Sequence, residues 1–270
     1  MKFIISHDVD HLFGHEHWLR DLIYPKLWVR TGIQMISRKI TVKEAFLRIK
    51  SCFQKERNCL DALMKFDKKY GVPSVFFFGM NQGLGMSYFP DEARPIIEIV
   101  HNNGFDVGVH GIAFDNFDGI KTEYDAFKNL LGFEPCGIRM HYVRYNESTF
   151  LTEASVGYIF DSTEFNKEKC GTIKAPYKVN GMWEFPLSIM DGYLTQNFTK
   201  AKEETIARIE KCRDCGIDYV TVLFHDYQFN SGYLDMRDWY IWLIEKISLS
   251  EEDSFISYKD AIKELEVQDG

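Results

Sequence analysis

Short apolar runs alternate with amphipathic segments along the whole chain. The runs are rich in β-branched and aromatic residues, as in "SVFFF" and "YVTVLF". Nearly continuous apolar runs of this kind are typical of parallel strands that are covered on both faces. We expect strands at residues 3–6, 74–78, 106–109, 137–141, 158–160, 183–185, 219–224 and 255–257.

The segments between these runs have apolar residues at helical spacing. Ile96, Ile97 and Val100, for example, fall on one face of a helix. Four of the segments are followed directly by a glycine, a common helix C-terminal signal, at positions 71, 104, 132 and 216. We expect helices at residues 58–70, 91–103, 122–131, 200–215, 237–247 and 259–264. Strands that alternate with helices predict a (β/α) barrel or an open doubly wound sheet.

The composition agrees with one folded domain. The chain has 270 residues, 45% of them hydrophobic, which is enough for a sizeable core. No low-complexity linker divides it, so we expect a single domain over residues 1–270. The formal net charge of −8 argues against a general nucleic-acid binder. The N-terminal apolar run is too short for a signal peptide, and no run approaches the length of a membrane span, so we expect a cytoplasmic protein.

One long segment, residues 12–57, separates the first strand from the first predicted helix. A connection of this length is typical of a lid or a binding loop with helices of its own. Between Glu16 and Arg57 it carries ten Lys and Arg against four Asp and Glu, which leaves −14 for the rest of the chain. A basic insert on an acidic protein predicts contact with an anionic ligand or a membrane surface, although a solvated helical face would show the same pattern.

Ionisable side chains stand at the carboxyl ends of several predicted strands. They are Asp8, Asp10, His110, Arg139, His141, Asp161 and His225. Because the carboxyl ends of parallel strands meet at one rim of a sheet, we expect these groups to share a site. Carboxylate and imidazole ligands suit one divalent metal ion, with Zn²⁺ as the expected identity, and leave an open position for water.

The order of these motifs resembles the polysaccharide deacetylase family of metal-dependent carbohydrate esterases. "SHDVDH" is similar to the first motif of that family, a strand that ends in paired aspartates. "DVGVHG", "RMHY", "FDST" and "TVLFHD" resemble the second to fifth motifs and follow in the family's order. The resemblance implies a distorted (β/α) barrel of about seven parallel strands.

The resemblance also implies roles for the first two motifs. Asp10 and His110 would bind the metal ion, and Asp8 would take the proton of the attacking water. The family's second motif has a further histidine four residues after the first, but Phe114 stands at that position here. His141 stands where the third motif usually has proline, and it is our preferred replacement ligand because it is also an imidazole. Asp115 is the alternative.

The remaining motifs imply the groups that handle protons and negative charge. His225 would act as the acid, and Asp161 would orient its ring by accepting the ring N–H. Arg139 would pair with Asp8. The backbone N–H of Tyr142 would bind the oxyanion, so the position of this residue would matter more than its side chain.

These roles predict a metal-dependent hydrolase that removes an acetyl group from an amino sugar. Because no export signal is evident, we expect an N-acetylated sugar or a lipid- or nucleotide-linked glycan precursor as substrate, as in surface-polysaccharide assembly. Two other classes stay open at this point. One is a different barrel amidohydrolase or phosphoesterase with two metal ions, and the other is a carbohydrate-binding protein with a degenerate site.

Overall fold

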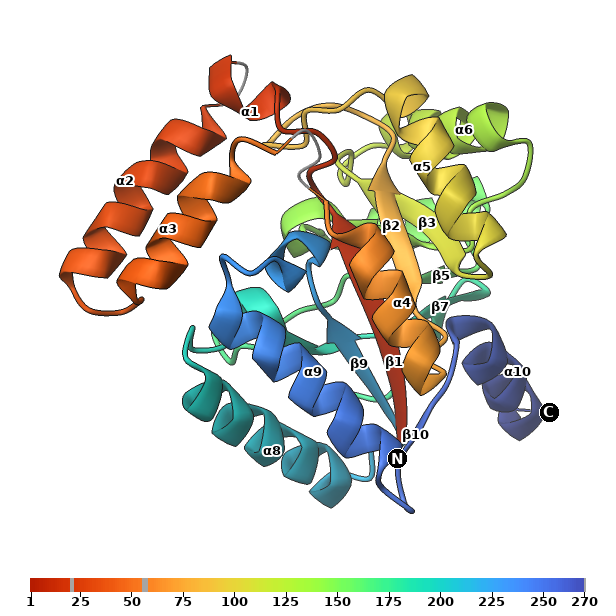
Figure 1. The fold of residues 1–270 in the computed structure, drawn as a ribbon. Helices are drawn as coiled ribbons and strands as arrows, with labels where there is room; N and C mark the ends of the chain where they lie inside the picture. The colour runs from red at the N-terminus through yellow and green to blue at the C-terminus, as the bar shows by residue number, and fades with distance from the viewer. Residues whose placement is uncertain (20–21, 55–57, 270) are drawn as a thin grey trace.

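A computed structural model describes residues 1–19, 22–54 and 58–269, and a curved sheet forms its centre (Figure 1). The strands are β1 (Lys2–Val9), β2 (Val75–Gly79), β3 (Asp106–Gly111), β4 (Ile138–Met140), β5 (Phe160–Asp161), β6 (Tyr177–Val179), β7 (Met182–Glu184), β8 (Leu187–Met190), β9 (Tyr219–Leu223) and β10 (Ser254–Phe255). Their order across the sheet is β6-β7-β5-β4-β3-β2-β1-β9-β8, and β10 pairs with the start of β1.

The sheet is parallel except where β6 runs antiparallel to β7. Within the described residues its two end strands, β6 and β8, do not pair, so the sheet curls into an open barrel. The predicted distorted (β/α) barrel is therefore confirmed. In the described residues the sheet has ten strands, of which all but β6 run parallel, so there are nine parallel strands rather than about seven. Several of them are only two to four residues long. All eight predicted strands are present, and β6 and β8 are the two that were not predicted.

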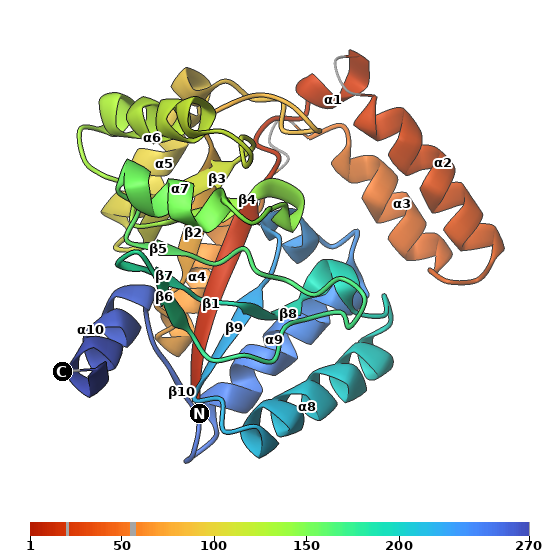
Figure 2. The ribbon, with the colours of Figure 1, turned by 180° about the vertical axis from the view of Figure 1, so that it is seen from behind.

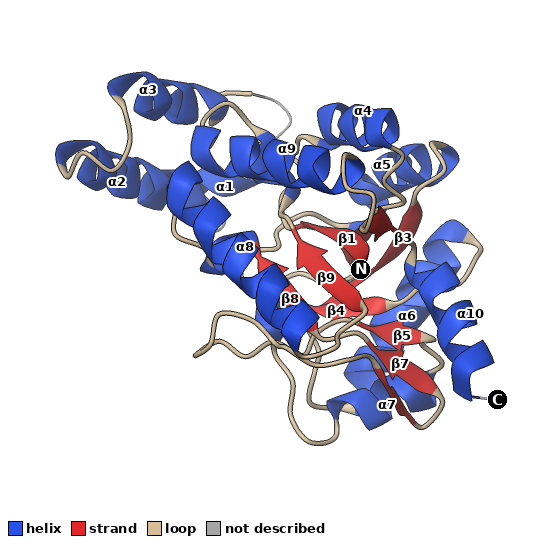
Figure 3. Ribbon diagram, turned by 90° about the horizontal axis from the view of Figure 1, so that it is seen from below, coloured by secondary structure: helices blue, strands red, loops and turns tan. Residues whose placement is uncertain are grey.

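Helices cover the outer side of this sheet (Figure 3). They are α4 (Leu60–Tyr70), α5 (Pro90–Asn102), α6 (Phe117–Leu131), α7 (Thr149–Val156), α8 (Phe198–Asp214) and α9 (Leu234–Ser248). A further helix, α10 (Tyr258–Asp269), begins against the inner face, where Tyr258 packs on Phe160 of β5. Each of the six predicted helices lies within or overlaps one of these. Among the described residues, no helix is both long and apolar enough to cross a membrane.

The two faces of the sheet bury different side chains. Along β1, Phe3 and Ile5 belong to the core between the sheet and its outer helices. Ile4 points to the inner face, where it joins a mostly aromatic cluster with the first turn of α10. There the ring of Tyr258 stacks on Phe160 with their centroids 4.2 Å apart. The interior is thus filled at the amino end of the strands, and only the carboxyl end is left for a site.

The 12–57 segment contains three helices, α1 (Glu16–Leu19), α2 (Ile23–Ile36) and α3 (Val42–Ser51). Helices α2 and α3 lie side by side and project from the body as a hairpin (Figures 1 and 2). Arg48 of α3 attaches the hairpin to the body, because its Nε donates to the Gly232 carbonyl at 2.7 Å. The described part of the 12–57 segment is thus largely helical.

Candidate active site

Strand β1 brings two carboxylates to the rim of the sheet. Asp8 is the penultimate residue of β1 and Asp10 follows the strand directly. His7 points to the opposite face, where its Nε2 lies 3.0 Å from Oδ2 of Asp67 in α4. Asp8 and Asp10 both line a cavity of about 1050 Å³. The alternation of side chains on an extended strand explains why these two residues share one face.

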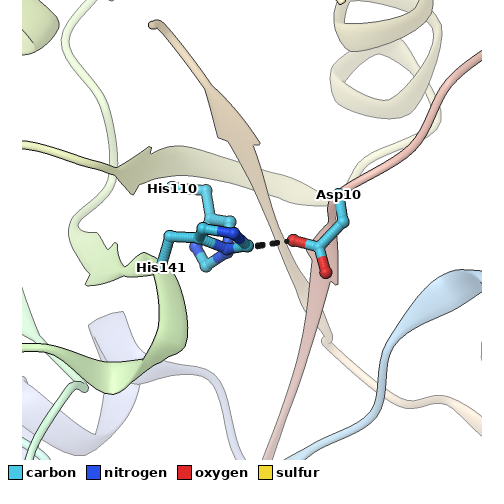
Figure 4. Close-up of side chains that lie close together, drawn as sticks. All are labelled: Asp10, His110 and His141. Carbon is cyan, nitrogen blue, oxygen red and sulfur yellow. Dashed lines mark hydrogen bonds and ion pairs between the residues drawn. The ribbon is translucent and has the colours of Figure 1, made fainter. Parts of the chain in front are cut away.

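Asp10 meets two histidines from neighbouring parts of the rim (Figure 4). His110 lies in β3, and His141 follows β4 directly. Oδ1 of Asp10 is 3.2 Å from His110 Nε2 and 3.3 Å from His141 Nδ1. In the described part of the chain, this is the one group of three His, Cys, Asp or Glu side chains whose ligand atoms lie within 4.8 Å of one another. All three residues are buried.

A backbone carbonyl binds the outer nitrogen of each imidazole. His110 Nδ1 is 3.0 Å from the Arg139 oxygen, and His141 Nε2 is 3.3 Å from the Leu84 oxygen. Because a carbonyl can only accept, those nitrogens carry the ring protons. The two inner nitrogens, 3.0 Å apart, then present lone pairs to each other. With the Asp10 carboxylate they form a cluster of three lone pairs that needs a cation at its centre. That cation is either a proton on an imidazole, which is then donated to Asp10, or a divalent metal ion, which this donor set fits.

The charges around this group favour a cation. Burial acts to raise the pKa of Asp10, but hydrogen bonds from His110 and His141 outweigh it and hold that pKa well below its usual value. Burial acts to lower the pKa of His110, whereas the carboxylates of Asp8 and Asp10 raise it above its usual value. Asp10 therefore stays ionised, and the site stabilises positive charge on or between its imidazoles.

Of the two alternatives for the third ligand, the structure brings His141 and not Asp115 to this group. Asp115 is exposed, and its Oδ1 accepts a hydrogen bond from Asn116 Nδ2 at 2.9 Å. Phe114, which stands at the position of the missing histidine, lies beneath the guanidinium of Arg144 at 4.7 Å. A histidine after β4 thus occupies the space next to His110, because β3 and β4 are paired in the sheet.

Arg139 reaches Asp8, as expected. Its Nη1 lies 3.4 Å from Asp8 Oδ1, and both side chains are buried. The rest of its guanidinium is fixed, since Nε donates to the Ser162 carbonyl at 2.7 Å and Nη2 lies 3.1 Å from the Tyr258 hydroxyl. A chain of contacts therefore runs from α10 through Arg139 to Asp8 and fixes the position of this carboxylate.

Tyr142 follows His141 in an unusual backbone conformation. Its φ is 59° and that of Val143 is 45°, both in the left-handed region that L residues seldom occupy. Its side chain is largely exposed, and its hydroxyl donates to the Leu84 carbonyl at 2.9 Å. The turn bends the chain directly after His141 and keeps Tyr142 at the cavity wall. Strain of this kind is often concentrated at functional sites.

His225 also lies at the rim, but its partner is not the expected one. Its Nδ1 is 2.7 Å from Oδ1 of Asp191, the residue that follows β8. Oδ2 of the same carboxylate accepts the His225 backbone N–H at 2.7 Å and a hydrogen bond from Gln228 Nε2 at 2.8 Å. His225 Nε2 lies 3.8 Å from Oδ2 of Asp10. The ring is therefore oriented with its second nitrogen toward Asp10, and so toward the Asp10–His110–His141 group, which could hold a metal ion and is called the metal-ligand group below.

The position of Asp161 explains why the predicted pairing with His225 is wrong. Asp161 ends β5, which pairs with β4 and β7, whereas His225 follows β9, which pairs with β1 and β8. Asp161 is instead buried beside Glu184, and burial raises the pKa of both carboxyls. The missed signal is "LSIMDG", a short apolar run that ends in an aspartate in the same way as the recognised motifs.

The surroundings of His225 stabilise its protonated form. Burial acts to lower its pKa, but the charge and hydrogen bond of Asp191 and the charges of Asp10 and Asp8 raise it to about 10. A histidine with such a pKa is an imidazolium at neutral pH, so it can donate a proton to a leaving group.

The cavity extends from these residues to the hairpin and has a cationic wall. Five of its lining residues carry exposed positive side chains that form no ion pair within the described residues: Arg30, Arg38, Lys39, Lys167 and Lys200. A sixth, Arg48, is neutralised by Glu44 at 2.9 Å. The unpaired cations make the far end of the cavity attractive to an anionic group.

Solved structures show where this fold occurs among known proteins. A Mycobacterium smegmatis protein assigned as a polysaccharide deacetylase superposes with a TM-score of 0.66 at 17% identity, over 99% of this chain and 91% of its own. An assigned polysaccharide deacetylase from Pseudomonas aeruginosa PAO1 gives 0.57 at 12% identity, over 76% and 71%. PuuE allantoinase gives 0.61 at 12% identity, over 96% and 87%.

These similarities confirm the resemblance at the level of the fold. No family model matches the sequence, and no curated protein does. Since an allantoinase shares the fold, the choice of reaction depends on the side chains at the rim.

Proposed function

We propose that this chain, which has the fold of the polysaccharide deacetylases, is a single-domain, metal-dependent hydrolase that removes an acetyl group from an amino sugar. The observation that carries the proposal is the Asp10–His110–His141 group, whose ligand atoms converge beside Asp8 and His225. One end of the cavity thus combines a cation site, a carboxylate and a protonated imidazole. This combination suits hydrolysis of an amide bond.

Different side chains of the site have different roles in such a reaction. A divalent ion held by Asp10, His110 and His141, with Zn²⁺ as the expected identity, would supply Lewis-acid chemistry. Asp8, fixed by Arg139 at 3.4 Å, accepts the proton of the attacking water.

The other two roles complete the reaction. The backbone N–H of Tyr142 donates to the developing oxyanion of the acetamide. His225, oriented by Asp191, donates its proton to the departing amine as the C–N bond breaks. Acetate and the free amino sugar are the products.

The expected result is release of acetate from an N-acetylated hexosamine phosphate by protein loaded with Zn²⁺, and loss of that activity on chelation. Asp8→Asn is the matched variant, because Asp8 is not one of the three ligands: turnover should fall by about 10²–10⁴-fold while metal content is unchanged. One ion per chain agrees with the proposal. Two ions would favour the two-metal hydrolase, and chelator-resistant sugar binding without acetate release would favour the binding protein.

The unpaired cations support a substrate that carries phosphate. A lipid- or nucleotide-linked glycan precursor has a phosphate or diphosphate next to the sugar, and Arg30, Arg38 and Lys39 line the same cavity as the metal-ligand group. Such a precursor is used in surface-polysaccharide assembly, which agrees with the cytoplasmic location that the sequence predicts. A lipid-linked form would also bring the 12–57 insert to a membrane surface.

Replacing Arg30, Arg38 and Lys39 together with Ser is expected to raise KM by about 10-fold or more and to change kcat little, because these groups bind the substrate away from the scissile bond. Steady-state kinetics on a sugar phosphate measure this effect. The control replaces Lys43 and Lys50, exposed cations of the same hairpin that do not line the cavity. An unchanged KM in the first variant, or an equal rise in the control, would exclude a phosphate subsite at this wall.

A further inference from the structure

The end of the α2–α3 hairpin exposes apolar side chains that no described part of the protein covers. We call residues 33–46, where α2 turns into α3, the hairpin tip; it lies away from the body in both views (Figures 1 and 2). Ile33 and Ile36 at the end of α2 are 62% and 81% exposed, and Val42 and Phe46 of α3 are 73% and 64% exposed. Residues this apolar are rarely so exposed in a group on a soluble protein.

These side chains continue along both helices as stripes at helical spacing. On α2 the stripe also includes Val29, and on α3 it continues through Ile49 to Phe53, all exposed. Because the spacing is three or four residues, each stripe lies on one side of its helix. The side of α2 that lines the cavity is a different one, formed by Ile23, Leu27, Arg30 and Gln34, and Arg38 lines the cavity just after the helix. The hairpin therefore has two different exposed sides. One lines the cavity, and the other carries the apolar stripes.

The charge of the hairpin identifies the kind of surface that would cover the stripes. Residues 22–54 contain seven Lys and Arg and a single acid, Glu44. Glu44 is buried and bound to Arg48 at 2.9 Å, so within residues 22–54 no exposed carboxylate accompanies Arg30, Arg38, Lys39, Lys43 and Lys50. Two copies that met through this surface would bring like charges together. An anionic surface would complement it.

We propose that the hairpin tip docks on an anionic lipid bilayer, with the apolar stripes inserted at the headgroup level and Arg38, Lys39 and Lys43 bound to lipid phosphates. Apolar and aromatic residues flanked by Lys and Arg, without a membrane-spanning segment, are the features of elements that lie in the membrane interface.

The cavity gives this docking a consequence for substrate access. Arg38, Lys39 and Ile40 belong to the tip and also line the cavity that contains the metal-ligand group. When the tip is in the headgroup layer, the cationic end of the cavity lies beside the lipid phosphates. This consequence rests on the proposed reaction, but the docking itself does not, because it needs neither metal nor substrate.

Co-sedimentation of the full chain with vesicles tests the proposal. The wild type is expected to bind vesicles of phosphatidylcholine with about one third phosphatidylglycerol, and to bind several-fold more weakly to phosphatidylcholine alone or at about 1 M salt. Ile33→Ser with Ile36→Ser should weaken binding about tenfold or more, since each loses a buried alkyl group. Neither residue lines the cavity, so acetate release from a water-soluble substrate should stay unchanged.

Leu249→Ser with Val267→Ser is the matched control. These residues are 84% and 82% exposed but lie outside the hairpin, so vesicle binding should not change. The proposal is wrong if the wild type does not bind anionic vesicles, or if the tip variant binds as well as the wild type. Sedimentation equilibrium without lipid adds a second measurement: a wild-type dimer that the tip variant dissociates would show that another copy covers the stripes instead.

Discussion

His141→Ala is expected to lose the metal ion, whereas Asp115→Ala keeps it. His141 Nδ1 is 3.3 Å from Asp10 Oδ1 and 3.0 Å from His110 Nε2, so its loss removes one of the three proposed ligands and leaves two in a buried site. We expect metal affinity to fall by about 100-fold or more and turnover by about 10³-fold or more, because each remaining role depends on the bound cation. Metal content per chain and acetate release measure the two effects.

Asp115 provides the control because it was the sequence-based alternative for the same ligand. It is exposed and bonded to Asn116, so its replacement should leave both metal content and turnover near those of the wild type. A second variant, Phe114→His, tests whether a histidine four residues after His110 can replace His141 as a ligand. Combined with His141→Ala, it should not restore metal binding, since residue 114 packs against Arg144. Metal loss in Asp115→Ala with full retention in His141→Ala would contradict the site described above.

The sequence predicts that most site residues lie at one rim of the sheet, because this depends only on where each strand ends and on which side each side chain points. Strand ends are marked by a change from apolar to polar residues, and parallel strands must present these ends at one rim. The alternation of an extended strand places Asp8 and Asp10 together and sends His7 to the other face. The structure agrees on each point, and Asp67 occupies the position that His7 requires on the outer face.

The pairing of side chains across the sheet does not follow from such rules. Which strand lies next to β9 depends on the fold of the whole chain, and β8 has only four residues, with a register irregularity between Leu187 and Ile189. Local periodicity carries little information for so short an element. The order of motifs therefore suggested Asp161, whereas the neighbouring strand supplies Asp191.

The exposure of the apolar side chains at the hairpin tip does not follow from the sequence pattern either. Apolar residues at helical spacing in the 12–57 segment predict helices with one buried face. They do not indicate whether the protein itself provides the covering surface. Only the structure shows that Ile36 and Val42 stay exposed while Tyr24 and Ala45 are buried.

Asp191→Asn is expected to move the alkaline limit of activity downward. The acid must be protonated when the C–N bond breaks, so activity is lost as the pH rises through the pKa of His225. That pKa is raised from 6.5 to about 10, with Asp191 as the largest contribution that raises it. Without this carboxylate the pKa falls back toward its usual value. We therefore expect turnover to fall by about tenfold at pH ~6 but by a few hundredfold, about 200–300, at pH ~8, with little change in KM.

Asn keeps an oxygen that can accept the His225 backbone N–H, so the loop after β9 should remain folded, which a thermal melt can verify. Asp161→Asn is the matched control, because it removes a buried carboxylate from the same rim that does not touch His225. Its pH profile should keep the wild-type alkaline limit even if the level of activity changes. A downward shift in Asp161→Asn with none in Asp191→Asn would mean that the acid is oriented by the carboxylate after β5. His225→Ala should be inactive at both pH values, because the proton donor itself is absent.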